Sequence, residues 1–197
     1  MGKVVQFIPS TEKFGFKPVR KKESLPPTKH GQLNLFIGGK IVPFNKLSAF
    51  EEALMIDDQG DMIKARELYL KAIQEKDAVA DAYCNLGILE SEAKNYSKAI
   101  DCFTLCLKEE PRHFEAHYNL ANLYAEVGNL PLAKVHYQIS IEIHPEFPNS
   151  YFNLALTLAM NKEITEAIRS LETYRDLARP EDRSQAQDLI NTLSRTL

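Results

Sequence analysis

The sequence of 197 residues contains no tryptophan, only three cysteines and no long hydrophobic run. A membrane-spanning helix needs about 18 consecutive apolar residues, so we expect no transmembrane insertion. The first residues offer no apolar run of signal-peptide length before Pro9 interrupts them. Three cysteines without paired spacing do not indicate a disulfide framework. Together these absences predict a reduced, cytoplasmic setting.

Motifs of the common enzyme and nucleotide-binding classes are also missing. The chain has neither G-x-G-x-x-G nor G-x-x-x-x-G-K-[ST], and it lacks the G-x-S-x-G motif of serine hydrolases. Cys102 and Cys106 share one helix face, and we interpret them as small hydrophobic residues of the packing rather than as nucleophiles. The sequence therefore predicts a protein that is not an enzyme and that needs no cofactor.

The net charge of −3 conceals two unlike regions. Residues 1–45 carry eight Lys or Arg and two Asp or Glu, whereas residues 46–197 carry sixteen and twenty-five. Five of the ten prolines and five of the eight glycines also precede residue 46. We therefore expect a basic, mostly disordered arm at residues 1–45, followed by an acidic region of globular composition.

The acidic region repeats itself every 34 residues without gaps. Asn85-Leu86-Gly87 is followed at that offset by Asn119-Leu120-Ala121 and then by Asn153-Leu154-Ala155. Small residues recur at one position and large apolar residues four places later: Ala65, Ala99, Ala133 and Ala167, then Tyr69, Phe103, Tyr137 and Leu171. A period of this length is typical of a solenoid whose units stack to share one core.

Each unit predicts two helices separated by a turn. The turns are indicated by Gly60-Asp61, Lys94-Asn95, Gly128-Asn129 and Asn161-Lys162. We assign the units to residues 46–79, 80–113, 114–147 and 148–180. Residues 181–197 predict a final helix that caps the last pair. Its apolar stripe consists of Ala186, Leu189, Ile190 and Leu193. We expect Arg183, Asp188 and Arg195 to face water.

These units resemble the tetratricopeptide repeat (TPR) family, whose pattern is W-x₂-L-G-x₂-Y, then A-x₃-F, a small residue and Pro. The second unit matches at Tyr83, Leu86, Gly87, Ala99, Phe103, Cys106 and Pro111, and the third at His117, Leu120, Ala121, Tyr124, Ala133, Tyr137, Ser140 and Pro145. The fourth unit departs at Tyr174, and the first is weakest because Glu52 replaces the usual Leu. The resemblance implies an all-α, right-handed α-solenoid of four TPR helix pairs. More loosely, the repeats resemble the TPR block of bacterial MerR-type regulators.

In this family the first helix of each pair lines a concave groove that usually binds a peptide. By register, the groove holds an aromatic or apolar series, with a second series one turn on: Phe50, Cys84, Tyr118 and Phe152, then Leu54, Ile88, Asn122 and Leu156. Acidic residues flank it: Asp81 and Glu115, then Asp57, Asp58, Glu92 and Glu126. Such a groove favours a basic partner with apolar anchors. A second interpretation is that part of the aromatic series packs between helices.

Asn85, Asn119 and Asn153 form a ladder at the repeat period. An amide donates and accepts, so a row of amides can pair with a peptide backbone, as in the asparagine ladder of some long TPR superhelices. The alternative is that each amide bridges backbone within the solenoid. Chaperone-tail TPR domains hold a C-terminal carboxylate with Lys and Arg, but the corresponding places here are Asp81, Glu115 and Asn149. We therefore do not expect an acidic Hsp90 or Hsp70 tail to bind.

Metal binding is not indicated by the histidine spacing. His113 and His117 are four residues apart, but Pro111 places His113 in a turn, and His117 takes the packing position of Tyr83 and Tyr151. The remaining histidines of the repeats, His136 and His144, have no carboxylate or cysteine at ligand spacing.

The basic arm leaves several functions open. It can act as a solubilising tail, dock on the acidic groove of its own chain, or contact nucleic acid or anionic lipid. No helix-turn-helix or zinc-ligand spacing occurs in it, which disfavours sequence-specific DNA reading. The sequence predicts a protein–protein interaction adaptor. The alternative is a nucleic-acid- or membrane-surface-associated regulator whose arm binds and whose repeats are scaffold.

Overall fold

The structure is a computed structural model that describes residues 47–196. Within that range every regular element is an α-helix, and the helices are α1 Ala49–Asp58, α2 Met62–Glu75, α3 Val79–Glu92, α4 Tyr96–Glu109, α5 Phe114–Glu126, α6 Leu130–Ile143, α7 Pro148–Met160, α8 Ile164–Leu177 and α9 Pro180–Ser194. The predicted all-α class is confirmed for these residues. The predictions about residues 1–45 lie outside the described residues.

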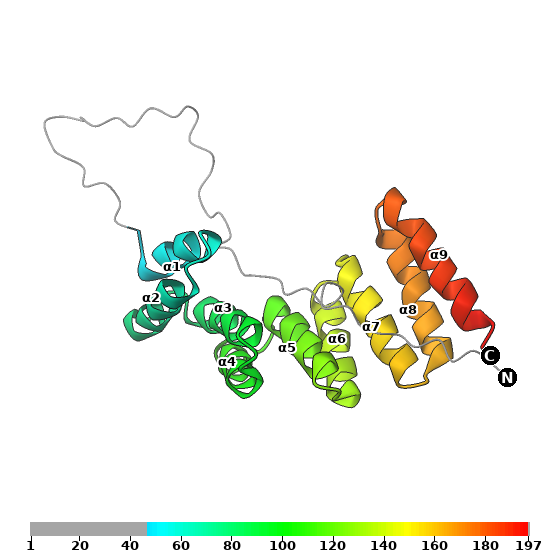
Figure 1. Ribbon diagram of the computed structural model, residues 1–197, viewed down its shortest axis with the longest axis horizontal. Helices are drawn as coiled ribbons and strands as arrows, with labels where there is room; N and C mark the ends of the chain where they lie inside the picture. The colour runs from blue at the N-terminus through cyan, green and yellow to red at the C-terminus, as the bar shows by residue number, and fades with distance from the viewer. Residues whose placement is uncertain (1–46, 197) are drawn as a thin grey trace, which may run out of the picture.

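The helices form antiparallel pairs that stack in a curved row (Figure 1). Each of α1, α3, α5 and α7 packs against the helix that follows it, and each pair contacts the next. In addition, α3 contacts α5 and α5 contacts α7. The first helices of successive pairs therefore lie side by side, and together they form one continuous face of the solenoid.

The turn inside each pair uses the same backbone conformation at the same place in the repeat. Gly60, Lys94, Gly128 and Lys162 are spaced at the repeat period and have φ of 81°, 59°, 82° and 64°. A left-handed residue at this point reverses the chain after the first helix. Glycine adopts this conformation without steric cost, while the two lysines hold it at some strain. The predicted turns are confirmed.

Polar side chains cap several helix starts. Ser48 and Glu51 form a reciprocal capping box at α1. The side chains of Asp61 and Asn129 accept backbone N–H groups in the first turns of α2 and α6. Pro131 lies in the first turn of α6, where it removes no helical hydrogen bond. Residues close in sequence thus fix where these helices begin.

The core between paired helices is built from the two periodic positions. All four alanines at the small position are fully buried, and their bulky counterparts Tyr69, Phe103, Tyr137 and Leu171 are buried beside them. The closest approach is at Gly87, where an added Cβ would lie 2.8 Å from Cε1 of Phe103. Small residues therefore set the distance between the helices, and large ones fill the space that remains.

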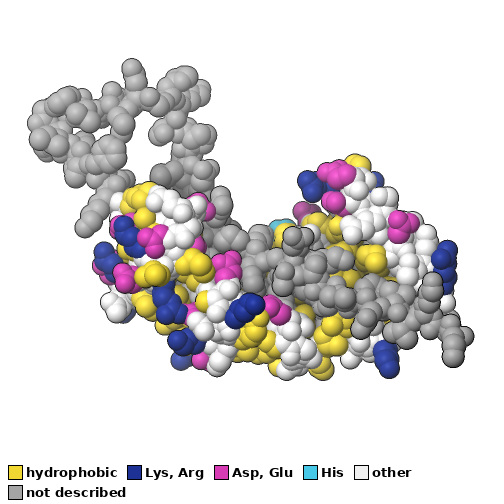
Figure 2. Space-filling view, in the orientation of Figure 1, with side chains coloured by type: hydrophobic (Ala, Val, Ile, Leu, Met, Phe, Trp, Pro, Cys, Tyr) yellow, Lys and Arg dark blue, Asp and Glu magenta, His cyan; other side chains and the backbone are white. Residues whose placement is uncertain are grey.

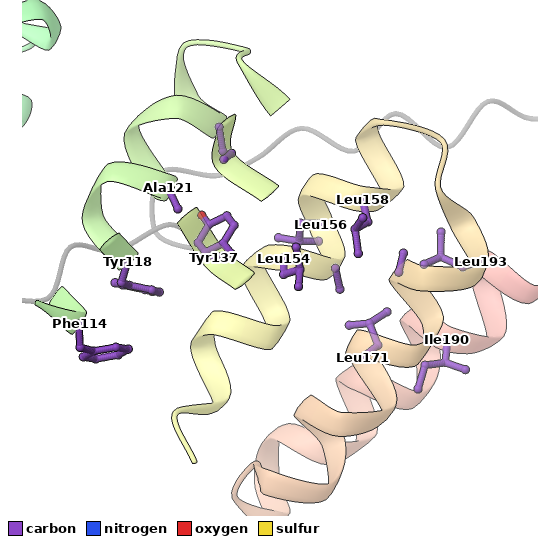
Figure 3. Close-up of a cluster of buried hydrophobic side chains, with 14 residues drawn as sticks. Phe114, Tyr118, Ala121, Tyr137, Leu154, Leu156, Leu158, Leu171, Ile190 and Leu193 are labelled. Carbon is purple, nitrogen blue, oxygen red and sulfur yellow. The ribbon is translucent and has the colours of Figure 1, made fainter. Parts of the chain in front are cut away.

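Helix α9 closes the end of the stack as predicted. Ile190 and Leu193 join the cluster that contains Leu171 and Leu154 (Figure 3). Ala186 is buried, and Leu189 is partly buried against the same cluster. The polar residues Arg183, Asp188 and Arg195 are exposed.

None of the described helices is both long enough and apolar enough to cross a membrane. The cytoplasmic setting stays a prediction.

Candidate functional site: the concave face

The asparagine ladder is buried and hydrogen-bonded inside the solenoid. Asn153 Nδ2 donates to the Tyr118 hydroxyl at 3.1 Å and to Asn122 Oδ1 at 3.0 Å. Asn119 Nδ2 lies 3.8 Å from Cys84 Sγ as a donor to the sulfur. Each of these two amides thus reaches the preceding unit. Asn85 hydrogen-bonds the Tyr69 side chain. Contact of the three asparagines with a peptide backbone stays a prediction.

Aromatic residues of the predicted groove make contacts between helices. Phe50 packs against Tyr69 with ring centroids 6.0 Å apart. Tyr118 meets Phe147 edge-on at 5.2 Å, and burial raises the pKa of its hydroxyl to about 12. Phe152 is half-buried, 4.9 Å from the ring of Tyr174. The packing interpretation therefore holds for these rings, and their role as ligand contacts stays a prediction.

The second series of groove positions forms a largely buried layer. Ile88, Asn122 and Leu156 are buried, and Leu54 is partly buried. Asn122 Oδ1 accepts a hydrogen bond of 2.6 Å from the Tyr137 hydroxyl, which ties α5 to α6. These residues support the concave face from within.

The acidic residues remain partly accessible. The side chains of Asp81 and Glu115 are 31% and 25% exposed. Burial raises the pKa of Asp57, and so does the charge of Asp58, whereas a hydrogen bond of 2.8 Å from the Tyr69 hydroxyl lowers it. Burial and the charge of Asp57 also raise the pKa of Glu92. Carboxylates of α1 and α3 thus act on one another across the first two repeats. In the space-filling view, acidic side chains are interspersed with Lys and Arg over the visible surface of the α1–α4 half (Figure 2).

A histidine pair joins α5 to α6. His117 Nε2 lies 3.1 Å from the Pro111 carbonyl oxygen, which can only accept, so Nε2 carries a proton. The Nδ1 atoms of His117 and His136 are 2.9 Å apart, and His136 therefore donates to His117. Burial lowers the pKa of both residues. For His136, burial and the electrostatic effect of His117 together lower the pKa to about 4. Both side chains are accordingly neutral at pH 7.

One cluster of side chains was missed by sequence reasoning. Cys84 of α3, Cys106 of α4 and His113 before α5 are buried, and their ligand atoms all lie within 4.8 Å of one another. The sequence separations, 22 and 7 residues, match no common metal motif. His113 and His117, four residues apart in sequence, face different partners, because His113 turns toward Asp81 and His117 toward His136.

Comparison with protein-family models locates the repeats. A tetratricopeptide repeat model matches residues 80–113, and a second tetratricopeptide repeat model matches residues 102–134 and 136–169. The described helix pairs and their turns follow the same period. The chain is a tetratricopeptide repeat protein. The looser likeness to MerR-type regulators stays a prediction.

Solved structures agree with the TPR fold. The structure of MamA is similar with a TM-score of 0.66 at 17% identity, over 73% of this chain and 83% of that chain. The first TPR domain of Spaghetti (RPAP3), bound to the HSP90 peptide SRMEEVD, has a TM-score of 0.55 at 17% identity, over 59% and 91%. The TPR2B domain of yeast Sti1, in a complex with pHsp70, has a TM-score of 0.55 at 20% identity, over 60% and 98%. At such identities the likeness establishes the fold. No curated protein matches the chain.

Proposed function

We propose that this TPR protein is a non-enzymatic adaptor that binds a basic protein or peptide segment with apolar anchors on its concave face. The coarse function is supported by the TPR family and by two similar TPR structures that hold peptide partners. The preference for basic partners rests on one observation of this chain. Partly exposed carboxylates lie on the first helices, and some of them raise one another's pKa.

Like charges that raise each other's pKa carry an electrostatic cost that a bound cation relieves. Burial and the charge of Asp57 on α1 raise the pKa of Glu92 on α3, and burial and the charge of Asp58 raise that of Asp57. Asp81 and Glu115 stand at places where chaperone-tail TPR domains carry cations. An acidic peptide such as the SRMEEVD of the Spaghetti complex would meet repulsion here. Lys or Arg in the ligand would instead meet unlike charge.

The fourth repeat supplies features suited to anchors and to backbone. Phe152 keeps part of its ring accessible beside Tyr174. Asn153 Oδ1 is buried without a hydrogen-bond partner, although its amide nitrogen donates twice. An unsatisfied buried acceptor costs about 1–3 kcal/mol. A backbone N–H from a bound segment would recover that cost once the fully buried Asn153 side chain turns toward the surface.

The first test compares two fluorescent peptides of equal length and equal apolar content, one with three lysines and one with three glutamates, by anisotropy with the full chain. We expect the lysine peptide to bind at least about tenfold more tightly, and added salt to weaken it. Glu92→Gln with Glu115→Gln should weaken binding about fivefold. The matched control is Glu109→Gln with Glu172→Gln, which removes two exposed charges from the second helices α4 and α8. Equal loss in the control, or equal binding of both peptides, contradicts the proposal.

The same assay addresses the basic arm as an occupant of the concave face. Replacing Lys17, Arg20, Lys21 and Lys22 with glutamine in the full chain should tighten lysine-peptide binding if the arm competes for the acidic surface. Unchanged affinity in that variant argues against self-docking and leaves an outside partner as the ligand.

A further inference from the structure

Cys84, Cys106 and His113 bring three strong metal-ligating groups into one buried site. Their ligand atoms lie within 4.8 Å of one another, although they come from α3, α4 and the turn before α5. The ligand atoms of a tetrahedral zinc ion lie about 2.0–2.3 Å from the metal, so any two of them are less than about 4 Å apart. Small side-chain rotations are therefore enough to bring all three groups onto one ion.

The imidazole of His113 is oriented by two hydrogen bonds. Its Nδ1 accepts the backbone N–H of Ala116 at 3.1 Å, so this nitrogen carries a lone pair. Its Nε2 lies 3.0 Å from Asp81 Oδ1, and the proton on Nε2 is donated to that carboxylate. Donation of one ring N–H to a carboxylate is the arrangement that orients metal-bound histidines, and in His113 the other ring nitrogen accepts a backbone N–H. A metal would compete with the Ala116 N–H for Nδ1.

The sulfur atoms have suitable surroundings. The amide of Asn119 is aimed at Cys84 Sγ from 3.8 Å, and an N–H donor stabilises a sulfur that carries negative charge. All three cysteines of the chain are free thiols. Cys102, although one helical turn from Cys106, does not belong to the cluster.

Repeat packing does not require these residue types. One period later the same places hold Tyr118, Ser140 and Phe147, which pack in a buried cluster or hydrogen-bond within that junction. Within residues 47–196, two thiols and an imidazole meet at the junction of the second and third repeats and at no other junction. Packing accounts for a small residue at the place of Cys106 and Ser140, but it does not account for three ligating residues in one junction.

We propose that Cys84, Cys106 and His113 bind one thiophilic transition-metal cation of the Zn²⁺ or Cu⁺ type, with Asp81 as the positioning residue for His113. Two thiolates and one imidazole are the donor set that such ions prefer over oxygen ligands. Metal binding requires both sulfurs as thiolates, so protons are released when the ion binds. The ion would link α3, α4 and α5 across two repeats. The site does not depend on the proposed peptide function.

The test uses the full chain, reduced and stripped of metal, with Zn²⁺ and Cu⁺ as separate probes in anaerobic equilibrium dialysis. Wild type and the control Cys102→Ser are expected to retain one ion per chain. Cys84→Ser and Cys106→Ser are each expected to weaken binding more than about 100-fold, which exceeds the effect of an outer partner. Asp81→Ala should weaken it about 10- to 100-fold, and Asp81→Asn, which keeps an acceptor oxygen, should restore most of that loss.

Substitution with Co²⁺ supplies a second readout that does not rely on variants. Sulfur ligation in the wild type should give a thiolate-to-cobalt absorption band, and Asp81→Ala should retain this band at higher cobalt concentration. If the serine variants lose helical circular dichroism, the wild-type band decides the question, and its absence overturns the site. The proposal is also overturned if the wild type retains neither Zn²⁺ nor Cu⁺. It is overturned as well if a Cys84→Ser/Cys106→Ser double variant retains as much metal as the wild type.

Discussion

Two junctions of the solenoid occupy equivalent places yet differ in chemistry. The junction formed by α3, α4 and α5 contains Cys84, Cys106 and His113, and the junction formed by α5, α6 and α7 contains Tyr118, Ser140 and Phe147 at the same repeat positions. In both, an asparagine of the following repeat donates to the first of these residues. The backbone geometry is therefore shared, while the groups it brings together are not.

The comparison separates what a repeat imposes from what it permits. At the second junction a hydrogen bond of 2.9 Å joins the hydroxyls of Ser140 and Ser150, and Tyr118 packs against Phe147. At the first junction Ala116 replaces Ser150, and the space holds sulfur and imidazole. Equivalent positions of the repeat can thus carry an inert core or a set of ligands.

The largest expected effect concerns the bulky position that both junctions share. Phe103→Ala and Tyr137→Ala each empty a fully buried site beside an alanine, so each should lower the free energy of unfolding by about 3–5 kcal/mol. Denaturant unfolding followed by circular dichroism measures both. A cost below about 1 kcal/mol for either one would show that the two repeats are not equivalent scaffolds.

A smaller effect distinguishes the asparagine bonds of the two junctions. A double-mutant cycle of Asn153→Ala with Tyr118→Phe should give a coupling energy of about 1 kcal/mol, because a buried N–H···O bond is lost. The cycle of Asn119→Ala with Cys84→Ala should give less than about 0.5 kcal/mol in the metal-free chain, because sulfur is a weak acceptor. Equal coupling energies would contradict this difference.

The last effect is a pH dependence that belongs to the third repeat. The pKa of folded His136 is lowered to about 4 from the ordinary 6.5, while the unfolded residue keeps the ordinary value. Its neutral form therefore contributes stability that is present above pH 6.5 and is lost as the pH falls toward 4. The slope stays below about 1.4 kcal/mol per pH unit. His117 and Tyr124 are its neighbours on α5.

Urea unfolding at several pH values between 6.5 and 4 checks this prediction. His136→Gln should flatten the pH dependence in that window. His144→Gln, an exposed residue just after α6, serves as the control and should leave it unchanged. The fourth repeat has Tyr151 and Ser170 at the corresponding places and offers no such pair. If the free energy of unfolding of the wild type and of His136→Gln changes equally with pH, the histidine pair is not the cause of the pH dependence.

The helix pairs, their turns and the capping helix could be predicted because the information is local and periodic. Gly60 and Gly128 mark turns by their freedom at positive φ, and Ala99 beside Phe103 sets a helix distance within one unit. Each unit contacts only its neighbours, so the period also predicts how the units stack. Ile190 and Leu193 show their role through helical spacing alone.

The candidate site was less predictable, because the repeat register predicts which side of a helix a side chain lies on but not which atoms it contacts. Tyr118 was placed on the concave side, yet its ring packs between helices against Phe147, and its hydroxyl binds Asn153. Carboxylates could be located by register because charged groups need only reach water. The hydrogen bonds of the amides depend on which atoms the next repeat presents at a few ångströms.

The amino-acid sequence by itself determined the TPR architecture, the acidic character of the repeats and their contrast with the basic arm. Only the tertiary structure decided that Cys84, Cys106 and His113 meet, since α3 must pair with α4 and the chain must then turn into α5. The physical reason is that helical period is a property of one segment, whereas a ligand set requires atoms from three segments at van der Waals distances.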